Sequence, residues 1–291
     1  MRKIFHLLRI KQWVKNLICF SGVIFGGKIF DSNSWLLSLG VFICFCFISS
    51  SIYVLNDILD RHADSLHPKK KYRPIASGSI SIKSAIIIGL INVSIGLIIS
   101  WILGISTFII VIIYLINNIL YSNYFKKIPI VDVFSIAFGF ILRLVSGIYV
   151  IGELPTAWII LCTMFLALFL GFSKRLSEME SIKIQNDFKQ RLVLFKYNEK
   201  SLTTLVNETS FGSILSYALF ATVSEKNPSL IITVPIVYYA IIYYKQSLFN
   251  GEFGEEPDLI ILTDKTILLC TISWLILVVT IIYLNLEIFS Y

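Results

Sequence analysis

The segment Leu36–Gly78 reads LLSLGVFICFCFISSSIYVLNDILDRHADSLHPKKKYRPIASG. Its first part, Leu36–Leu55, is almost entirely apolar, and a helix of about 20 such residues crosses the hydrocarbon core of a bilayer. Asp, His, Lys and Arg residues follow without a spacer. Charges so close to hydrocarbon are costly. The segment therefore predicts a membrane-spanning helix whose last turns carry charged groups with a task at the membrane surface.

The composition of the whole chain agrees with that interpretation. Hydrophobic residues make up 56% of its 291 residues and charged residues only 15%, whereas a soluble domain carries about a quarter. We therefore expect an all-α, polytopic membrane protein with a single domain, residues 1–291. Apolar segments predict nine membrane-spanning helices, at 13–29, 35–56, 82–103, 105–123, 131–151, 155–173, 203–223, 229–245 and 266–286.

The distribution of Lys and Arg predicts the orientation in the bilayer. Cytoplasmic loops of membrane proteins are enriched in these residues. With nine spans and a cytoplasmic amino terminus, all of the 25 Lys and Arg residues except Lys28, Arg143 and Lys226 lie on the cytoplasmic side. The carboxyl terminus then lies outside, and we expect the plasma membrane as the location. The net charge of +7 is thus orientation charge and indicates no nucleic-acid partner.

Oxygen-bearing side chains follow the apolar run at helical spacing. Asn56, Asp60 and Asp64 lie at i, i+4 and i+8 and would line one helix face, with Asp57 beside it. Mg²⁺ in proteins takes one or two carboxylates together with substrate phosphates, and Mn²⁺ is an alternative ion. Basic residues that suit phosphate oxygens follow at 69–73. The pattern predicts a metal–diphosphate site, and the alternative is a solvated, charged loop beside the membrane.

The segment NDILDRHAD, Asn56–Asp64, resembles the NDxxDxxxD motif of the UbiA-type intramembrane prenyltransferase superfamily. The resemblance implies nine transmembrane helices around a central cavity that opens to the cytoplasm. It also implies that Asn56, Asp57, Asp60 and Asp64 hold Mg²⁺ and a diphosphate at the mouth of that cavity. Of these, Asn56, Asp60 and Asp64 are expected to act in catalysis.

Four further segments resemble one branch of this superfamily, the polyprenyl-phosphate (decaprenyl-phosphate) phosphoribosyltransferases. They are LRIKQWVKN (Leu8–Asn16), YSNYFKKIPIVDVFSIAFGFILRLVSG (Tyr121–Gly147), GFSKRLSEM (Gly171–Met179) and GEEPDLIILTD (Gly254–Asp264). Ile10 stands where the branch usually has Pro. The branch implies transfer of 5-phosphoribosyl from 5-phosphoribosyl 1-diphosphate to a polyprenyl phosphate, as a step toward cell-envelope glycan precursors.

The matched segments imply further substrate-binding residues. The diphosphate, the 5-phosphate and the lipid phosphate need cations, which are expected among Lys11, Lys15, Lys70, Arg73, Lys126, Lys174 and Arg175. Lys11 and Lys15 are one helical turn apart, and Lys15 is expected to act in catalysis. Tyr121 and Asp132 are expected beside these cations. Glu256 is expected to accept hydrogen bonds from ribose hydroxyls, although a solvated connector explains this residue equally well.

Arg143 lies deep inside its predicted span, 131–151. A buried Arg in a membrane indicates a function and needs a partner. Two interpretations remain open, because Arg143 can either reach the lipid phosphate or steady an acid on a neighbouring helix.

Two other functions compete with phosphoribosyl transfer. A UbiA-type polyprenyl transferase that acts on an aromatic or other small acceptor would use the same metal face, but it would carry a second DxxxD motif. This chain has Asp132 there, with Ser135 and Ile136 where a paired acid would stand. A transporter would need polar groups or broken helices at mid-membrane, where this sequence has few. The sequence leaves the oligomeric state open.

Overall fold

The computed structural model describes residues 2–66, 70–185, 194–223, 227–251, 260, 263–286 and 288–289. Within these ranges every regular element is a helix, which confirms the predicted all-α class. In the same ranges seven helices are long and apolar enough to cross a membrane: Ser32–Leu59, Ile82–Leu103, Ile105–Lys127, Val131–Tyr149, Ala157–Ser181, Pro228–Phe249 and Lys265–Tyr283. The chain is therefore a multi-pass membrane protein.

The long helices are connected by short helical elements. The long helices are α3 (Ser32–Leu59), α5 (Ile82–Leu103), α6 (Ile105–Asn123), α7 (Val131–Tyr149), α8 (Ala157–Gln185), α9 (Glu199–Val223), α10 (Val234–Phe249) and α12 (Lys265–Tyr283). The short α-helices are α1 (Arg2–Leu7), α2 (Ser21–Phe25) and α4 (Arg61–Leu66). The 3-10 helices are η1 (Ile10–Phe20), η2 (Lys70–Tyr72), η3 (Phe125–Lys127), η4 (Leu194–Lys196) and η5 (Pro228–Thr233).

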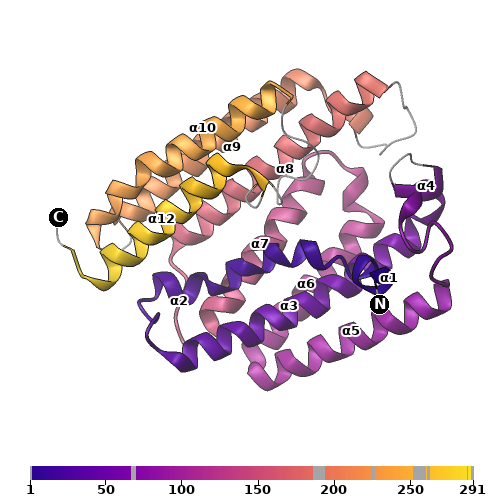
Figure 1. Cartoon of the computed structure of the whole chain (residues 1–291), viewed down its shortest axis with the longest axis horizontal. Coiled ribbons are helices and arrows are strands. Elements are labelled where there is room, and N and C mark those ends of the chain that lie inside the picture. Colours follow the sequence, from indigo (N-terminus) through magenta and orange to yellow (C-terminus); the bar gives the residue numbers. More distant parts are fainter. Residues whose placement is uncertain are drawn as a thin grey trace.

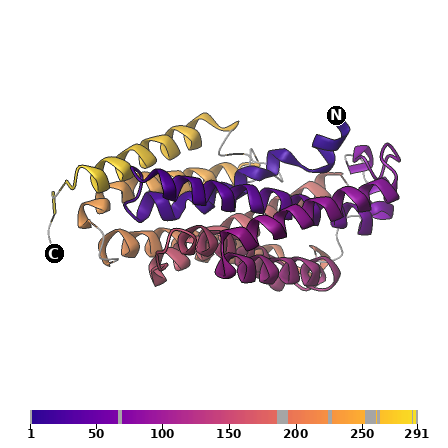
Figure 2. The ribbon, with the colours of Figure 1, turned by 90° about the horizontal axis from the view of Figure 1, so that it is seen from below.

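The helices form two groups that meet at α7 (Figure 1). One group contains α1 to α6, in which α3 packs on α5, α6 and η1. The other contains α8, α9, α10 and α12, in which α8 and α9 share the most extensive contact. From below, α12 lies along one outer face of the molecule (Figure 2). Because α7 contacts α6, η1 and α8, it joins the two groups.

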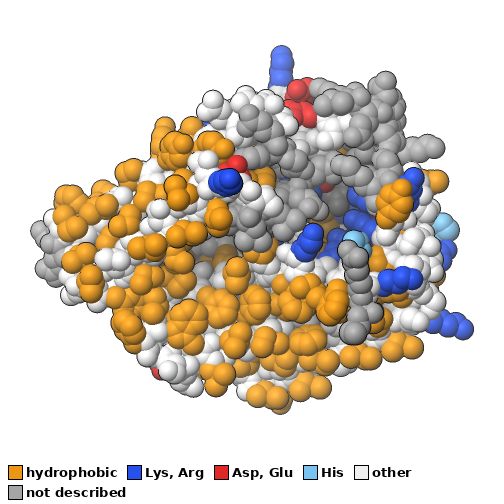
Figure 3. Space-filling view, viewed as in Figure 1, with side chains coloured by type: hydrophobic (Ala, Val, Ile, Leu, Met, Phe, Trp, Pro, Cys, Tyr) orange, Lys and Arg blue, Asp and Glu red, His pale blue; other side chains and the backbone are white. Residues whose placement is uncertain are grey.

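On the face shown in Figure 3, hydrophobic side chains cover a broad area away from the charged end. On α5, for example, Ile87, Leu90, Ile98 and Ile102 are all exposed. A helix that is apolar on all sides is stable in contact with lipid, where its backbone groups are satisfied within the helix. Lys and Arg gather instead toward the end of the molecule that carries α1 and α4 (Figure 3). The surface therefore has a lipid-compatible region and one charged end.

Two of the nine predicted spans are built differently. Residues 13–29 do not form one α-helix, because η1 and the short α2 occupy that stretch. Residues 203–223 lie in α9, but Asn207, Glu208 and many Ser and Thr make α9 too polar to count among the seven candidate spans. Hydroxyls such as those of Thr209 and Ser213 donate to carbonyls one turn earlier in α9. The prediction of nine spans is thus not confirmed in the described residues, and the predicted orientation stays a prediction.

Candidate active site

The acid motif lies where α3 ends. After Leu59, the last residue of α3, Asp60 adopts φ −90° and ψ 5°, and α4 then begins. The Asp60 N–H donates to the Asn56 carbonyl at 2.9 Å, and the Asp64 N–H donates to the Asp60 carbonyl at 2.8 Å. Asn56, Asp60 and Asp64 therefore keep their helical spacing, although the uninterrupted helix expected from the sequence is split at Asp60.

Two arginines hold the two buried acids of the motif. Arg73 Nη1, in the loop after η2, lies 2.6 Å from Asp64 and 3.3 Å from Asp57. Arg9, which follows α1, also forms an ion pair with Asp57. A buried carboxylate needs such a partner, because an isolated charge away from water is strongly penalised. The arginines thus tie the amino-terminal segment and the loop after α4 to the end of α3.

Asp60 and Asn56 have their partners on η3 and α6. Lys126 Nζ, in η3, lies 2.7 Å from Asp60, and the Ser122 hydroxyl of α6 donates to Asn56 Oδ1. The Asp60 side chain is 40% exposed, whereas that of Asp57 is only 2% exposed. Asp60 is therefore the acid of the motif that is most open to an incoming ligand.

The chemistry of this donor set fits a hard cation. In the part of the chain that the structure describes, no three His, Cys, Asp or Glu side chains gather as a metal cluster. Mg²⁺ does not require such a cluster, since one or two carboxylates and substrate phosphates suffice. Asn56, Asp60 and Asp64 offer an amide and two carboxylates along one helical stretch. The assignment of these residues and of Asp57 as metal ligands stays a prediction.

Sequence reasoning identified only some of the basic residues at this site. Sequence reasoning places Arg73 and Lys126 on phosphate oxygens, and the structure pairs both with acids of the motif. Sequence reasoning misses Arg9, which reads as ordinary orientation charge. The available signal was its position inside the LRIKQWVKN segment.

The winding of η1 separates Lys11 from Lys15. The sequence expectation, one helical turn between them, assumes an α-helix. A 3-10 helix has three residues per turn, so residues four apart point about 120° apart around its axis. Lys11 is exposed and Lys15 is half-buried. In η1 the two lysines are therefore more than one turn apart and point in different directions.

Arg143 lies among neutral groups and is only 5% exposed. Its Nε donates to Asn16 Oδ1 at 2.7 Å, its Nη2 to the Tyr114 hydroxyl at 2.6 Å, and its Nη1 to the Gly139 carbonyl at 2.9 Å. The Tyr114 ring and two phenylalanine rings pack against the guanidinium. Among the described side chains Arg143 forms no ion pair. The structure thus does not pair Arg143 with an acid on a neighbouring helix.

Asp132 and Arg175 form a buried ion pair between α7 and α8. Arg175 Nε lies 2.7 Å from Asp132 Oδ2, and its Nη1 lies 2.6 Å from Glu178. The exposed fractions of the Asp132 and Arg175 side chains are 0% and 1%. Sequence reasoning places both residues beside substrate, whereas the structure shows them bound to each other. A role for either in substrate binding stays a prediction.

Tyr197 completes this buried cluster, and sequence reasoning misses it. Its hydroxyl donates to Asp132 Oδ1 at 2.8 Å and accepts a hydrogen bond from the backbone N–H of Ile130. Burial raises the pKa of the Tyr197 hydroxyl, so this group remains a donor at neutral pH. The contact links residues 65 positions apart, and no motif in the sequence points to it.

The remaining expected residues are spread along the same elements. Tyr121 is half-buried near the end of α6, Lys70 begins η2, and Lys174 precedes Arg175 in α8. Glu256 lies outside the described residues.

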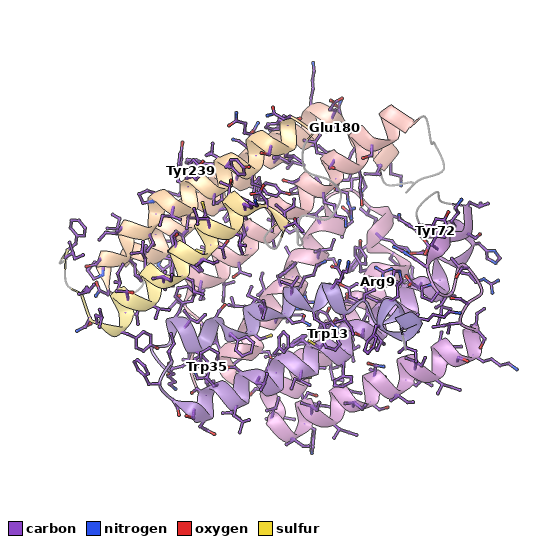
Figure 4. The ribbon with its side chains drawn as sticks, in the orientation of Figure 1. Arg9, Trp13, Trp35, Tyr72, Glu180 and Tyr239 are labelled. Carbon is purple, nitrogen blue, oxygen red and sulfur yellow. The ribbon has the colours of Figure 1, made fainter. Side chains whose placement is uncertain are left out.

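Segments far apart in the sequence meet at this charged end. In Figure 4, Arg9 and Tyr72 are at the same end of the molecule, close to where α3 ends. Acids from α3 and α4 there meet cations from the amino-terminal segment, the loop after η2, and η3. Carboxylates suit a divalent cation, and Arg and Lys suit phosphate oxygens. The arrangement is therefore capable of binding a metal–polyphosphate.

The chain is similar in sequence to two enzymes that have the same name. Decaprenyl-phosphate phosphoribosyltransferase of Corynebacterium glutamicum is 29% identical over 286 residues, covering 95% of this chain and 86% of that protein. The enzyme of the same name from Mycolicibacterium smegmatis is 27% identical over 285 residues, covering 92% of this chain and 88% of that protein.

The fold also matches a solved structure. A UbiA homologue from Archaeoglobus fulgidus bound to GPP and Mg²⁺ has a TM-score of 0.72 at 19% identity, covering 96% of this chain and 99% of that chain. Residues 17–257 match the UbiA prenyltransferase family, and this range is most of the chain. The resemblance seen in the motifs is therefore confirmed, and the chain belongs to the UbiA prenyltransferase family.

Proposed function

We propose that the protein transfers the 5-phosphoribosyl group of 5-phosphoribosyl 1-diphosphate to a polyprenyl phosphate. An oxygen of the lipid phosphate forms a bond to C1 of the ribose as the bond from C1 to the diphosphate breaks. The products are polyprenyl-phosphoryl-5-phosphoribose and diphosphate. Because the lipid phosphate is already an anion, it needs no general base to activate it.

One observation carries this proposal. The similarity to the two proteins named decaprenyl-phosphate phosphoribosyltransferase extends over at least 92% of this chain. This chain also carries the acid motif and the segments around Lys15, Lys126 and Lys174, which have the residue types that three phosphate-bearing groups require.

The acid motif supplies what the leaving diphosphate needs. Asn56, Asp60 and Asp64 would hold Mg²⁺, which when bound acts as a Lewis acid toward the leaving group. Mn²⁺ suits the same oxygen ligands. Arg73 and Lys126 lie 2.6 Å and 2.7 Å from two of these acids, so phosphate oxygens that arrive beside the acids come within their reach. Positioning and electrostatic stabilisation then account for catalysis.

The second candidate is prenyl transfer from a polyprenyl diphosphate to an aromatic or other small acceptor. The structural match to a UbiA homologue bound to GPP and Mg²⁺ favours it. The state of Asp132 counts against it, because both carboxylate oxygens of Asp132 are already bound, by Arg175 and by Tyr197. Ile136 stands one turn later, so no second acid is present there to help hold another metal ion.

We further propose that the site opens to the cytoplasm of a cell whose plasma membrane holds the protein. Phosphoribosyl diphosphate is soluble and highly charged, and ions do not enter hydrocarbon readily. The gathering of Lys and Arg at the end that holds the acid motif fits the positive-inside rule.

The test is a transfer assay on membranes that contain the protein. Phosphoribosyl diphosphate labelled in its ribose is incubated with polyprenyl phosphate and Mg²⁺, and the lipid phase is counted. We expect ribose label in the lipid only when polyprenyl phosphate is present. A parallel assay offers labelled polyprenyl diphosphate and an aromatic acceptor. Prenylation of that acceptor without ribose transfer would replace the proposal with the second candidate.

A further inference from the structure

The first element of the site, η1, is an 11-residue 3-10 helix. Runs of 3-10 helix longer than three or four residues are uncommon, because their hydrogen-bond geometry is poorer than that of an α-helix. Contacts outside η1 must therefore stabilise its winding. These contacts lie on α3 and α7.

The 3-10 winding aligns three residues of η1 on one face. Trp13, Asn16 and Cys19 are spaced by three, so they lie above one another when each turn has three residues. In an α-helix each such step would turn back by about 60°, and the row would spiral away from α3 and α7. Asn16 and Cys19 are fully buried on this face. Neighbouring helices can therefore hold η1 only if it keeps its 3-10 form.

Asn16 is the centre of the row. Its Oδ1 accepts from Arg143 Nε at 2.7 Å, and its Nδ2 donates to Cys46 Sγ of α3 at 3.3 Å. Trp13 donates to Ser50 of α3 at 3.0 Å, which adds a second contact between η1 and α3. Both polar ends of the Asn16 side chain are thus engaged, one by α7 and one by α3.

Arg143 binds three elements at once. It donates to Asn16 on η1, to Tyr114 on α6 and to the Gly139 carbonyl within α7. Burial of a charge beside neutral partners is costly. A neutral side chain would make at most one or two of these contacts, whereas the guanidinium presents five N–H donors in a fixed plane. Lys15 directly precedes Asn16 in η1, so it lies next to this junction.

We propose that Arg143 is a positioning residue for Lys15. By holding Asn16 it fixes the 3-10 winding of η1, and this winding sets the direction in which the neighbouring Lys15 leaves the helix. Arg143 therefore contacts no phosphate itself. The inference rests on the proposed function for its kinetic part only, because the effect of Arg143 on the winding of η1 can be measured without substrate.

The structural test is hydrogen–deuterium exchange of the purified protein in lipid nanodiscs, read by mass spectrometry. Arg143→Met and Asn16→Leu should raise exchange of peptides within residues 10–20 by about tenfold or more, since local opening becomes easier. Peptides of α8 and α9 serve as an internal control and should not change. Asn16→Asp is the matched variant, because its carboxylate still accepts from Arg143, and it should retain slow exchange. Unchanged exchange of residues 10–20 in Arg143→Met, or equal loss of protection everywhere, would overturn the proposal.

The kinetic test is a double-mutant cycle between Arg143 and Lys15 in the ribose-transfer assay. Misplacement of a catalytic group by about 1 Å can cost about 100-fold, so Arg143→Met should lower kcat/KM by that order. In a Lys15→Met background the same change should cost less than about threefold, because both substitutions then affect one contact. If the double mutant instead loses kcat/KM by the product of the two single-mutant factors, Arg143 acts independently of Lys15. That result would overturn the positioning role. If the unaltered protein transfers no ribose, the proposed function fails while the exchange experiment still decides the role of Arg143 in η1.

Discussion

At the residue scale, the acids of the motif differ in what they can do. Asp57 is buried with two arginines, whereas Asp60 has a single lysine and a side chain that is 40% exposed. Asp64 is also buried and shares Arg73 with Asp57. Of these acids, Asp60 can most easily take up a metal–diphosphate, because Lys126 can move from Asp60 onto a phosphate oxygen. Asp57 is better suited to hold Arg9 and Arg73 in place.

We expect Asp60→Asn and Asp64→Asn to lower ribose transfer by more than about a hundredfold. Each removes a charge from the metal face without removing volume, and a bound metal ion contributes several kcal/mol of charge stabilisation. Neither Mg²⁺ nor Mn²⁺ should restore activity. The measurement is transfer per molecule of protein, with the amount of folded protein in the membrane as the control. Near-normal turnover of either variant in chelator-treated membranes would remove the metal assignment.

The Tyr197 hydroxyl gives a prediction about pH. Burial raises its pKa above the ordinary value of about 10. A group with a raised folded pKa stabilises the fold fully below the unfolded pKa and loses that contribution as pH rises toward the folded pKa. Tyr197→Phe should therefore be less stable than the natural protein by about 1.5–3 kcal/mol at neutral pH, since it lacks a hydrogen bond to a charged group. Thermal unfolding in detergent should show this difference shrinking above about pH 10, and a difference that stays constant at high pH would contradict the assignment.

Residue identities were predictable where spacing carried the information. The helical spacing of Asn56, Asp60 and Asp64 follows from the i, i+4 pattern, and it is kept across the break between α3 and α4. Arg9 and Tyr197 did not follow, because their partners are 48 and 65 residues away and nothing local marks the contact. The pairing of Asp132 with Arg175 was hidden for the same reason, although both residues stood out individually.

At the scale of elements, η1 and α7 cross at very short range. A Cβ added at Gly147 would lie 2.0 Å from the Cys19 carbonyl oxygen, so only glycine permits this contact. A Cβ added at Gly22, in the adjoining α2, would likewise lie 2.7 Å from the Gly147 carbonyl oxygen. The two backbones thus approach more closely than side chains would allow. This crossing brings Asn16 within reach of Arg143.

Gly147→Ala should destabilise the protein and impair transfer, because backbone atoms of η1 must move to admit the methyl group. Overpacking of this kind costs about 1–3 kcal/mol. Gly139→Ala is the matched control on the same helix, since its Cβ would lie 3.4 Å from the Tyr114 ring, an ordinary contact distance. Thermal unfolding and transfer by both variants in detergent decide the matter. Equal behaviour of the two variants would show that the crossing tolerates a shift of η1.

Sequence patterns identified most of the long helices, and two of the predicted spans are not confirmed. The apolar stretch 13–29 reads as a span at α-helical rise, yet residues 10–20 wind as the 3-10 helix η1. Residues three apart also share a face of an α-helix, so the spacing of Trp13, Asn16 and Cys19 did not reveal this winding. The stretch 203–223 reads as a span because apolar residues dominate its second half. Its first half contains Asn207 and Glu208, and α9 is held mainly by packing on α8.

At the scale of the whole molecule, the acid motif and the cations that bind it are concentrated at one end of the helices. The acid motif, its cations and the elements α1, α4, η2 and η3 lie at one end (Figures 1 and 3). At the far end, Lys28 pairs with Glu153 at 2.7 Å. This asymmetry was predictable from the Lys and Arg count alone. The number of spans was not, because it depends on how η1 and α9 are built.

The same asymmetry predicts which side of the membrane the site faces. Ser65 is exposed and adjoins the buried Asp64, so a thiol at this position is accessible from the side to which the acid motif opens. We expect Ser65→Cys, in a background whose five native cysteines are replaced, to react with an impermeant thiol reagent only after the cells are opened. Saturating phosphoribosyl diphosphate with Mg²⁺ should slow that reaction, because a ligand on Asp64 shields its neighbour. Cys at Leu39, an exposed position within the span α3, is the control that should react slowly in both states, since a thiol in lipid does not ionise. Rapid labelling of Ser65→Cys in intact cells would place the acid motif outside, where a soluble cytoplasmic phosphoribosyl donor cannot reach it.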